Sequence, residues 1–419
     1  MYRKTILENG VKIVSESMDH LKSVSLGIWV NTGSRDETRL ENGVSHFIEH
    51  MSFKGTSRRN ALQIAKELDA IGGLTNAFTG KENTCFHARV LGRHFTALTE
   101  ILSDIFLNPL FDSNDIERER QVIFQEIRMV EDTPDDNIHE LFNHVFWGDH
   151  PLGMSVLGTQ KTVSAISKDN LVRYVNRSYV PEQIVVAAAG HVDHESIVSI
   201  FAPMFGMIEK KAPIIKRDKS HSHADVSISF KDLEQVHICL GGQASSIGSR
   251  KRFACAILNT ILGGNMSSRL FQEIRENKGL AYSIFSFLSS YSDAGLLGVY
   301  LATDPANVMP ALKTIYEEIR KLAGGEFSDS DLIAAKDYLT GGIYLSSESS
   351  EGRMMRIAKN EFVFDKYVSY EEVVSQLEET TVDQVIEVAR NIFRDDRVSL
   401  AFLGPFDGDL FDKSVLRFS

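Results

Sequence analysis

The sequence predicts an α+β fold of two similar domains, each a mostly antiparallel sheet packed with helices. Three observations support this prediction. The chain has 419 residues, enough for two or three domains with substantial cores. Alternating strand patterns and amphipathic helical patterns are interleaved along the whole chain. Finally, ISKDNLVRYVNRSYVPEQIVVAAAGHVD and TTVDQVIEVARNIFRDDRVSLAFLGPFD share the order helix, basic turn, apolar strand and glycine, which indicates a duplication.

The composition is that of an ordinary globular protein, with 43% hydrophobic and 24% charged residues. A net charge of −12 argues against a nucleic-acid binder and mildly favours basic partners. No stretch approaches the ~18 apolar residues of a membrane span, and the N-terminus lacks the apolar run of a signal peptide. Cys85, Cys239 and Cys255 are scattered and without C-x-x-C spacing. We expect them to be reduced and buried, which predicts a cytoplasmic location.

Residues 1–205 are predicted to form the first domain. Alternating and β-branched positions predict strands at 5–17 and 23–32, and a helix at Asn60–Ile71 is predicted to end at a glycine pair. The polar segment EDTPDD predicts a loop. The other expected elements of this half are a hairpin at 74–91, helices near 93–107, 115–132, 136–147 and 167–178, and an apolar strand at Ile184–Gly190.

Residues 206–224 lack periodicity and contain basic residues and a proline, which predicts an interdomain linker. His221 and His223 could bind a metal in principle, but we expect them to be solvated. Residues 225–419 are predicted to form the second domain and to repeat the order of the first. Its expected elements are strands at 236–244, 281–290, 295–303 and 397–404, and helices near 250–262, 266–277, 305–323, 328–345 and 381–393.

The segment Gly43–Thr56, GVSHFIEHMSFKGT, contains an H-x-x-E-H pattern. On a helix, His46 and His50 lie one turn apart on one face, where two imidazoles can bind one zinc ion. Glu49 lies on the neighbouring edge and could accept a proton from a water at the metal. This is the inverted form of the zinc-protease motif. The alternative is a chance pattern of surface histidines, so the interpretation requires a third ligand.

Residues 115–132 supply a candidate third ligand. Good helix formers and apolar residues on one side predict a helix, on which Glu119 and Glu126 share a face because they are seven positions apart. A glutamate directed at the histidine pair would complete a His2Glu site with one open position. The alternative is an ordinary solvated, charged helix.

With these motifs, the chain resembles the pitrilysin/insulinase-type zinc metallopeptidases, in particular the β-subunit of the mitochondrial processing peptidase and its bacterial homologues. FKGT after the histidine motif and KGLAY at Lys278–Tyr282 extend the resemblance into both halves. The resemblance implies one zinc ion per chain, held by His46, His50 and Glu126, because the family's third ligand lies 76 positions after the second histidine. It also implies that Glu119 assists the site.

The resemblance further implies which residues bind substrate. Asn76 and Ala77 correspond to the family's substrate-binding strand, and Arg275 and Tyr282 to an arginine–tyrosine pair that reaches the substrate. Asp136 and Glu140 lie where processing peptidases bind an arginine near the cut, although a solvated helix face is the alternative. No histidine follows His237, and a loose alignment of the two halves places Cys255 and Asn259 at the histidine positions. The second domain is therefore expected to be an inactive repeat that contributes to substrate binding.

The predicted function is a zinc-dependent endopeptidase that hydrolyses unfolded peptides or presequence-like segments, with Glu49 activating the water. The alternatives are a non-catalytic scaffold or partner subunit with the same fold, and a secreted or membrane-associated processing enzyme, which the N-terminus disfavours. Relatives of twice this length enclose a clamshell chamber, so we expect half a chamber per chain and a homodimer, or a heterodimer with a similar subunit. By the resemblance, the location is the bacterial cytoplasm, or the mitochondrial matrix if a transit peptide has been removed.

Overall fold

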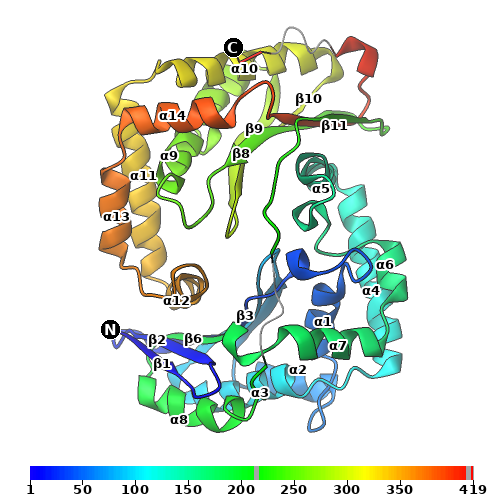
Figure 1. Cartoon of the computed structure of the whole chain (residues 1–419), viewed down its shortest axis with the longest axis vertical. Coiled ribbons are helices and arrows are strands. Elements are labelled where there is room, and N and C mark those ends of the chain that lie inside the picture. The colour runs from blue at the N-terminus through cyan, green and yellow to red at the C-terminus, as the bar shows by residue number, and fades with distance from the viewer. Residues whose placement is uncertain (212–216, 412–416, 419) are drawn as a thin grey trace. The chain divides into compact units, whose positions relative to one another are not determined.

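The computed structural model describes residues 1–211, 217–411 and 417–418, and these form two compact units with one sheet each (Figure 1). The first unit contains Met1–Met129, Met154–Asp218 and Leu345–Val368. The second unit contains Val130–Gly153, Lys219–Tyr344 and Ser369–Ser419. The units are not simply the two halves of the sequence, since each contains a segment from the other half. The boundaries 1–205, 206–224 and 225–419 therefore remain a prediction from the sequence.

The first unit has a six-stranded sheet in the order β1-β2-β6-β3-β5-β4. Its strands are β1 (Tyr2–Ile6), β2 (Lys12–Ser17), β3 (Ser23–Val30), β4 (Leu74–Thr79), β5 (Thr84–Leu91) and β6 (Ile184–Gly190). Only β2 and β6 pair in parallel, and β4 forms an edge. The predicted hairpin and the predicted strand Ile184–Gly190 are both confirmed.

Helices cover both faces of this sheet. The helices of the first unit are α1 (Val44–Ser52), α2 (Ala61–Ala70), α3 (Phe95–Leu107), α4 (Ser113–Asp132, whose last residues belong to the second unit), α6 (Gln160–Ala165), α7 (Lys168–Ser178), α8 (His194–Phe205) and α12 (Ser350–Phe364), with short 3-10 turns η1 (Ser34–Asp36), η2 (Gly92–His94) and η4 (Pro181–Gln183). Leu98 of α3 and Phe201 of α8 pack on one face, and Met354 and Ile357 of α12 pack on the other. Because both faces are covered, β6 is buried throughout and reads as a continuous apolar run.

The second unit has a five-stranded sheet in the order β7-β11-β8-β10-β9. Its strands are β7 (Val226–Ser229), β8 (Val236–Ala244), β9 (Ala281–Ser290), β10 (Gly295–Thr303) and β11 (Ser399–Leu403). Its helices are α5 (Pro134–Trp147), α9 (Arg252–Gly263), the π-helix η5 (Phe271–Asn277), α10 (Val308–Gly324), α11 (Asp329–Ser347, whose last residues belong to the first unit), α13 (Tyr370–Glu378) and α14 (Val382–Ile392), with 3-10 turns η3 (Pro151–Gly153), η6 (Pro305–Asn307) and η7 (Gly408–Leu410).

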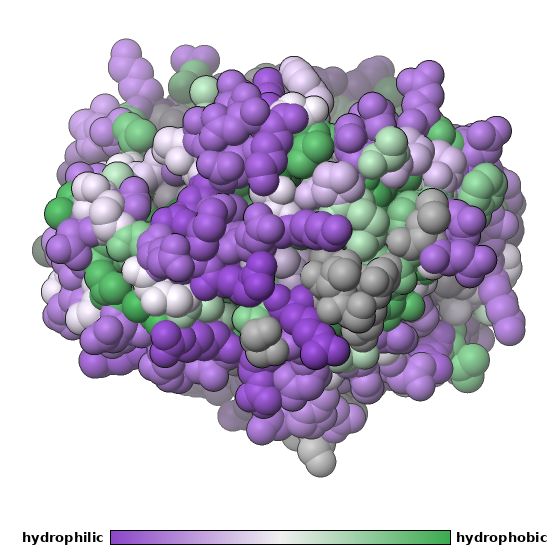
Figure 2. Space-filling model, turned by 90° about the horizontal axis from the view of Figure 1, so that it is seen from above, coloured by the Kyte–Doolittle hydropathy of each residue, from purple (hydrophilic) through white to green (hydrophobic). Residues whose placement is uncertain are grey.

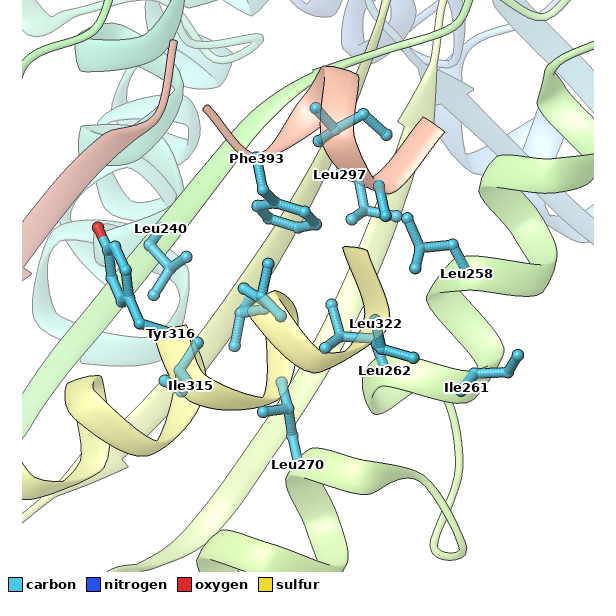
Figure 3. Close-up of a cluster of buried hydrophobic side chains, with 14 of the residues drawn as sticks. Leu240, Leu258, Ile261, Leu262, Leu270, Leu297, Ile315, Tyr316, Leu322 and Phe393 are labelled. Carbon is cyan, nitrogen blue, oxygen red and sulfur yellow. The ribbon is translucent and has the colours of Figure 1, made fainter. Parts of the chain in front are cut away.

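The two sheets have the same topology. The order β7-β11-β8-β10-β9 repeats β2-β6-β3-β5-β4, and β7 and β11 are again the parallel pair. The predicted α+β fold of two duplicated domains is therefore confirmed. The core of the second unit lies between its sheet and helices, where Leu240 of β8, Leu258 of α9, Ile315 of α10 and Phe393 after α14 lie together (Figure 3).

Several local predictions were wrong. EDTPDD is not a loop, because α4 extends to Asp132 and α5 begins at Pro134, which suits the first helical position. The helix predicted at 266–277 forms, but it begins only at Arg269, and most of it is the π-helix Phe271–Asn277. Strand β7 and helices α8, α12 and α13 were not predicted.

The predicted linker can be described only in part, since residues 212–216 lie outside the described residues. Just after these residues, the linker is held by Arg217, whose guanidinium donates two hydrogen bonds of 2.9 Å to the Asp36 carboxylate. His221 and His223 are exposed, as expected, although the His223 N–H donates to the Phe146 carbonyl.

The face seen from above in Figure 2 is mostly hydrophilic, and hydrophobic residues lie on it in small groups. Scattered exposed apolar residues are normal for a protein surface. Among the described residues, no helix combines the length and the apolar character that crossing a bilayer requires.

Candidate metal centre

The H-x-x-E-H segment forms helix α1, and its start is fixed by a glycine and a buried glutamate. Gly43 precedes the helix at a φ of 95°, and a Cβ there would lie 2.7 Å from the Leu157 carbonyl oxygen. Because glycine has no side chain to cap the helix, the Glu37 carboxylate takes that place and accepts hydrogen bonds of 2.8 Å from the N–H groups of Gly43 and Ser45. Two N–H groups at the start of α1 are thereby held by one carboxylate.

The apolar face of α1 fixes the direction of the histidines. Val44, Phe47, Ile48 and Met51 are at most 1% exposed and pack in one cluster with Ile123 and other residues of α4. This contact places the polar edge of α1 beside the glutamate-bearing face of α4.

The structure brings the three predicted ligands together. His46 Nε2 lies 3.6 Å and His50 Nε2 lies 3.5 Å from the same Glu126 oxygen, Oε2. The ligand atoms of these three side chains all lie within 4.8 Å of one another, close enough to hold one metal ion. Donor atoms on a tetrahedral zinc ion lie roughly 3.3–3.6 Å apart for bonds of ~2.0–2.2 Å. The spacing and the chemistry of the donors therefore fit zinc.

Burial keeps His46 in the form that binds metals. Burial, together with the neighbouring charge of His50, lowers the pKa of His46 to about 3. The imidazole is therefore neutral at physiological pH, as a metal ligand must be.

Glu119 contacts the site through His50. Its Oε2 lies 3.1 Å from His50 Nδ1, and its Oε1 forms a 2.8 Å ion pair with Lys54 Nζ. A carboxylate on the far nitrogen of a histidine fixes the ring orientation and the tautomer, so that Nε2 is free to bind metal. The structure thus places Glu119 behind His50 and outside the group of three, and its assisting role stays a prediction.

Glu49 bonds to a residue outside the group of three predicted ligands. Its Oε2 accepts a hydrogen bond of 2.5 Å from Thr79 Oγ1 at the end of β4. Burial raises the pKa of Glu49 above its usual value, and the Thr79 hydrogen bond opposes this rise. A carboxylate of raised pKa beside the predicted metal position is suited to accept a proton.

A cavity of about 490 Å³ opens beside Glu49 and His50 within the first unit. Its apolar lining comes from Phe53, which follows α1, from α2 and from Ala77 of β4, and its polar lining includes Lys54 and Asn76; the α2 residues are Ala61, Ile64, Ala65 and Leu68. Asn76 is exposed on the edge strand β4 and Ala77 is half-buried. The edge strand, the cavity and the three ligands are thus neighbours.

The other predicted residues lie in the second unit. The Arg275 guanidinium lies over the Tyr282 ring at 4.3 Å and over the Phe271 ring at 4.8 Å, and Tyr282 is 77% exposed. Asp136 is exposed and Glu140 half-buried on α5. The roles predicted for these four residues remain predictions.

Helix α9 follows β8 as α1 follows β3, and it carries Cys255 and Asn259 one turn apart. Their spacing matches that of His46 and His50. The residue types do not provide a histidine pair, and one metal site per chain stays a prediction.

Sequence reasoning missed three residues that hold the site: Glu37, Lys54 and Thr79. Lys54 and Thr79 lie inside the motifs FKGT and GLTNAFT, so the sequence did contain a signal for them. Glu37 had no such signal, because its partners Gly43 and Ser45 are defined only once the helix has formed.

Comparison with known proteins identifies the family. Residues 12–160 match the family described as insulinase (peptidase family M16), and residues 165–339 match the family described as peptidase M16 inactive domain. The chain is 38% identical over 405 residues to the uncharacterized zinc protease YmxG of Bacillus subtilis, covering 97% of this chain and 98% of YmxG. A protease from Helicobacter pylori has the same fold, with a TM-score of 0.90, 20% identity and coverage of 97% of this chain and 99% of that one. A peptidase M16 inactive domain from Pseudomonas fluorescens also has this fold, with a TM-score of 0.89, 19% identity and coverage of 96% of this chain and 98% of that one. The chain therefore belongs to the M16 (insulinase) family of peptidases.

Proposed function

We propose that this protein is a zinc-dependent endopeptidase that hydrolyses unfolded peptides or presequence-like segments. The observation that carries the proposal is the convergence of His46, His50 and Glu126, with Glu49 beside them and bonded elsewhere. A site that only bound metal would not need a fourth residue, Glu49, whose carboxylate is held separately and has a raised pKa.

The residues divide the work of the reaction. Zinc, when held by His46, His50 and Glu126, would polarise the scissile carbonyl and acidify the attacking water. Glu49 takes the proton of that water and delivers it to the leaving amine, and its raised pKa brings it closer to the pH at which it must do both. Glu119 keeps the His50 ring in the binding orientation.

The edge strand β4 is suited to hold the peptide. An extended segment can add to an unpaired sheet edge through main-chain hydrogen bonds, which makes binding tolerant of sequence. We assign Asn76 and Ala77 to this strand contact. The adjoining cavity is mostly apolar and would take an apolar side chain next to the cut.

From the second unit, we assign Arg275 and Tyr282 to the substrate as well. The exposed Tyr282 hydroxyl can donate to a developing oxyanion, and Arg275 holds its ring. We assign Asp136 and Glu140 to a basic side chain of the peptide. We further propose one zinc ion per chain, a dimer that encloses a chamber and a cytoplasmic location; sedimentation analysis that found only monomers would remove the dimer.

The rival function is a scaffold or partner subunit without activity. Glu49 separates the two functions, because a scaffold gains nothing from a half-buried carboxylate beside three predicted metal ligands.

The test replaces Glu49 with Gln. The variant should cleave an unfolded peptide about 10²- to 10⁴-fold more slowly, the range of general-base catalysis. Its zinc content, measured by mass spectrometry, should stay at the wild-type value. The matched control is Glu100→Gln, the same change at an exposed position of α3, which should keep the wild-type rate. A wild-type rate in Glu49→Gln would exclude the proposed base, and wild-type protein without peptidase activity would favour the scaffold.

A further inference from the structure

The Glu49 side chain accepts a hydrogen bond from Thr79, and Thr79 lies on a different element from Glu49. Glu49 sits near the end of α1, whereas Thr79 is the last residue of β4. A glutamate side chain has three rotatable bonds, so its carboxylate position is not determined by the helix alone. Something outside α1 must select one orientation.

The hydroxyl of Thr79 is held firmly. Thr79 pairs with Thr84 across the β4–β5 ladder, and a tight turn follows in which the Gly80 N–H donates to the Asn83 carbonyl at 2.8 Å. The Thr84 hydroxyl donates to the Thr32 carbonyl at 3.0 Å, which ties β5 to the segment that follows β3. The donor to Glu49 therefore stands on a fixed part of the sheet.

The bond has the length of a hydrogen bond from a hydroxyl to a charged carboxylate, ~2.5–2.7 Å. It engages Oε2 and leaves the second oxygen of Glu49 available for a water. Among the described residues, the group that could hold a metal ion contains Glu126 and does not contain Glu49.

We propose that Thr79 is a positioning residue that fixes the Glu49 carboxylate as the proton acceptor and keeps it from becoming a metal ligand. The inference rests on the proposed function, because it assigns Glu49 the role of base. Thr79 lies only two and three positions after Ala77 and Asn76, the residues assigned to the peptide. The strand that binds the substrate is thus the strand that aligns the base.

The test compares Thr79→Val with Thr79→Ser in zinc-loaded protein. Valine keeps the β-branched shape that suits the strand and removes the hydroxyl, whereas serine keeps the hydroxyl. Thr79→Val should lower kcat by about 10- to 100-fold, the value of one hydrogen bond to a charged group, with KM and zinc content unchanged. Thr79→Ser should restore kcat to within about threefold of the wild type. In a Glu49→Gln background, Thr79→Val should cause no further loss, because the two residues act as one unit.

A structural measurement decides the proposal independently of activity. In crystals of the zinc-loaded variants, the Glu49 carboxylate should leave its wild-type position in Thr79→Val and keep it in Thr79→Ser. An unmoved carboxylate in Thr79→Val, or an additive loss in the double variant, would overturn the role of Thr79. Wild-type protein that cleaves no peptide would overturn the proposed function instead, while the crystal comparison would still decide whether Thr79 positions Glu49.

Discussion

Glu37 is the residue whose replacement tests most directly how helix α1, which carries His46 and His50, is held. It is fully buried below α1, and burial raises its pKa from the usual 4.5 to about 7, even though the N–H groups of Ser45 and Gly43 donate to it. The folded protein therefore binds this proton more tightly than the unfolded chain does. We consider the change Glu37→Gln, which keeps the shape and cannot ionise.

The sign and the size of the effect follow from linkage. Below pH 4.5 the carboxyl is protonated in both states, and its contribution to stability is fully present. As the pH rises through about 7, that contribution is lost, because the folded protein must then bury a charge. The shift from 4.5 to about 7 corresponds to about 3 kcal/mol at about 1.4 kcal/mol per pKa unit. Glu37→Gln should not show this loss.

The assay needs a signal from the first unit alone. The chain has two tryptophans, Trp29 in the first unit and Trp147 in the second. In a Trp147→Phe background, Trp29 fluorescence reports urea unfolding of the first unit at a series of pH values from 4.5 to 8.5. The difference in unfolding free energy between Glu37→Gln and its parent should move by about 3 kcal/mol in favour of the variant across this range.

A difference of the opposite sign would refute the reasoning. If the parent gained stability over Glu37→Gln with rising pH, the hydrogen bonds and the helix N-terminus would be stabilising the carboxylate by more than burial costs it. The glutamine amide can also change the unfolding free energy by an amount that does not depend on pH. That amount cancels when the difference between Glu37→Gln and its parent is compared across the pH series.

Three further predictions concern the site itself. Glu119→Gln should weaken zinc binding by about 10- to 100-fold in a chelator competition, since it removes the charged partner of a ligand; an unchanged affinity would limit Glu119 to its pair with Lys54. Ala65→Phe should fill the cavity and shift cleavage in a peptide library toward small residues next to the cut, whereas an unaltered profile would remove the cavity from substrate binding. Asp136→Asn combined with Glu140→Gln should reduce any enrichment of arginine or lysine near the cut, and a wild-type profile with no such enrichment would discard the basic preference.

The sequence predicted most of the fold because its strands and helices carry strong local patterns. The all-apolar strand Ile184–Gly190 and the alternating hairpin were found with their correct limits. The errors occurred where position depends on distant packing. Helix α12 buries Met354 and Ile357 against the first sheet although it lies in the second half of the chain, and no local pattern states which sheet a helix will cover.

The candidate site shows the same limit. Helical spacing alone placed His46 and His50 on one face of α1. The choice of Glu126 came from the family spacing, because the contact between α1 and α4 is not written in either segment. The hydroxyl of Thr79 and the carboxylate of Glu37 were overlooked for a related reason: a hydrogen bond between two elements exists only after both have been placed.

The two repeats show what an H-x-x-E-H segment needs in order to become a site. Helix α9 occupies the place of α1 in the second sheet, and its Cys255 Sγ lies 3.4 Å from the hydroxyl of Ser245. In the first repeat, by contrast, Glu37, Glu119 and Thr79 reach α1 from three other segments and hold its start, one predicted ligand and the proposed base. The chemistry proposed for this protein therefore depends on these partners as much as on the motif. Transplanting the H-x-x-E-H residues onto α9 should accordingly fail to create a second active site.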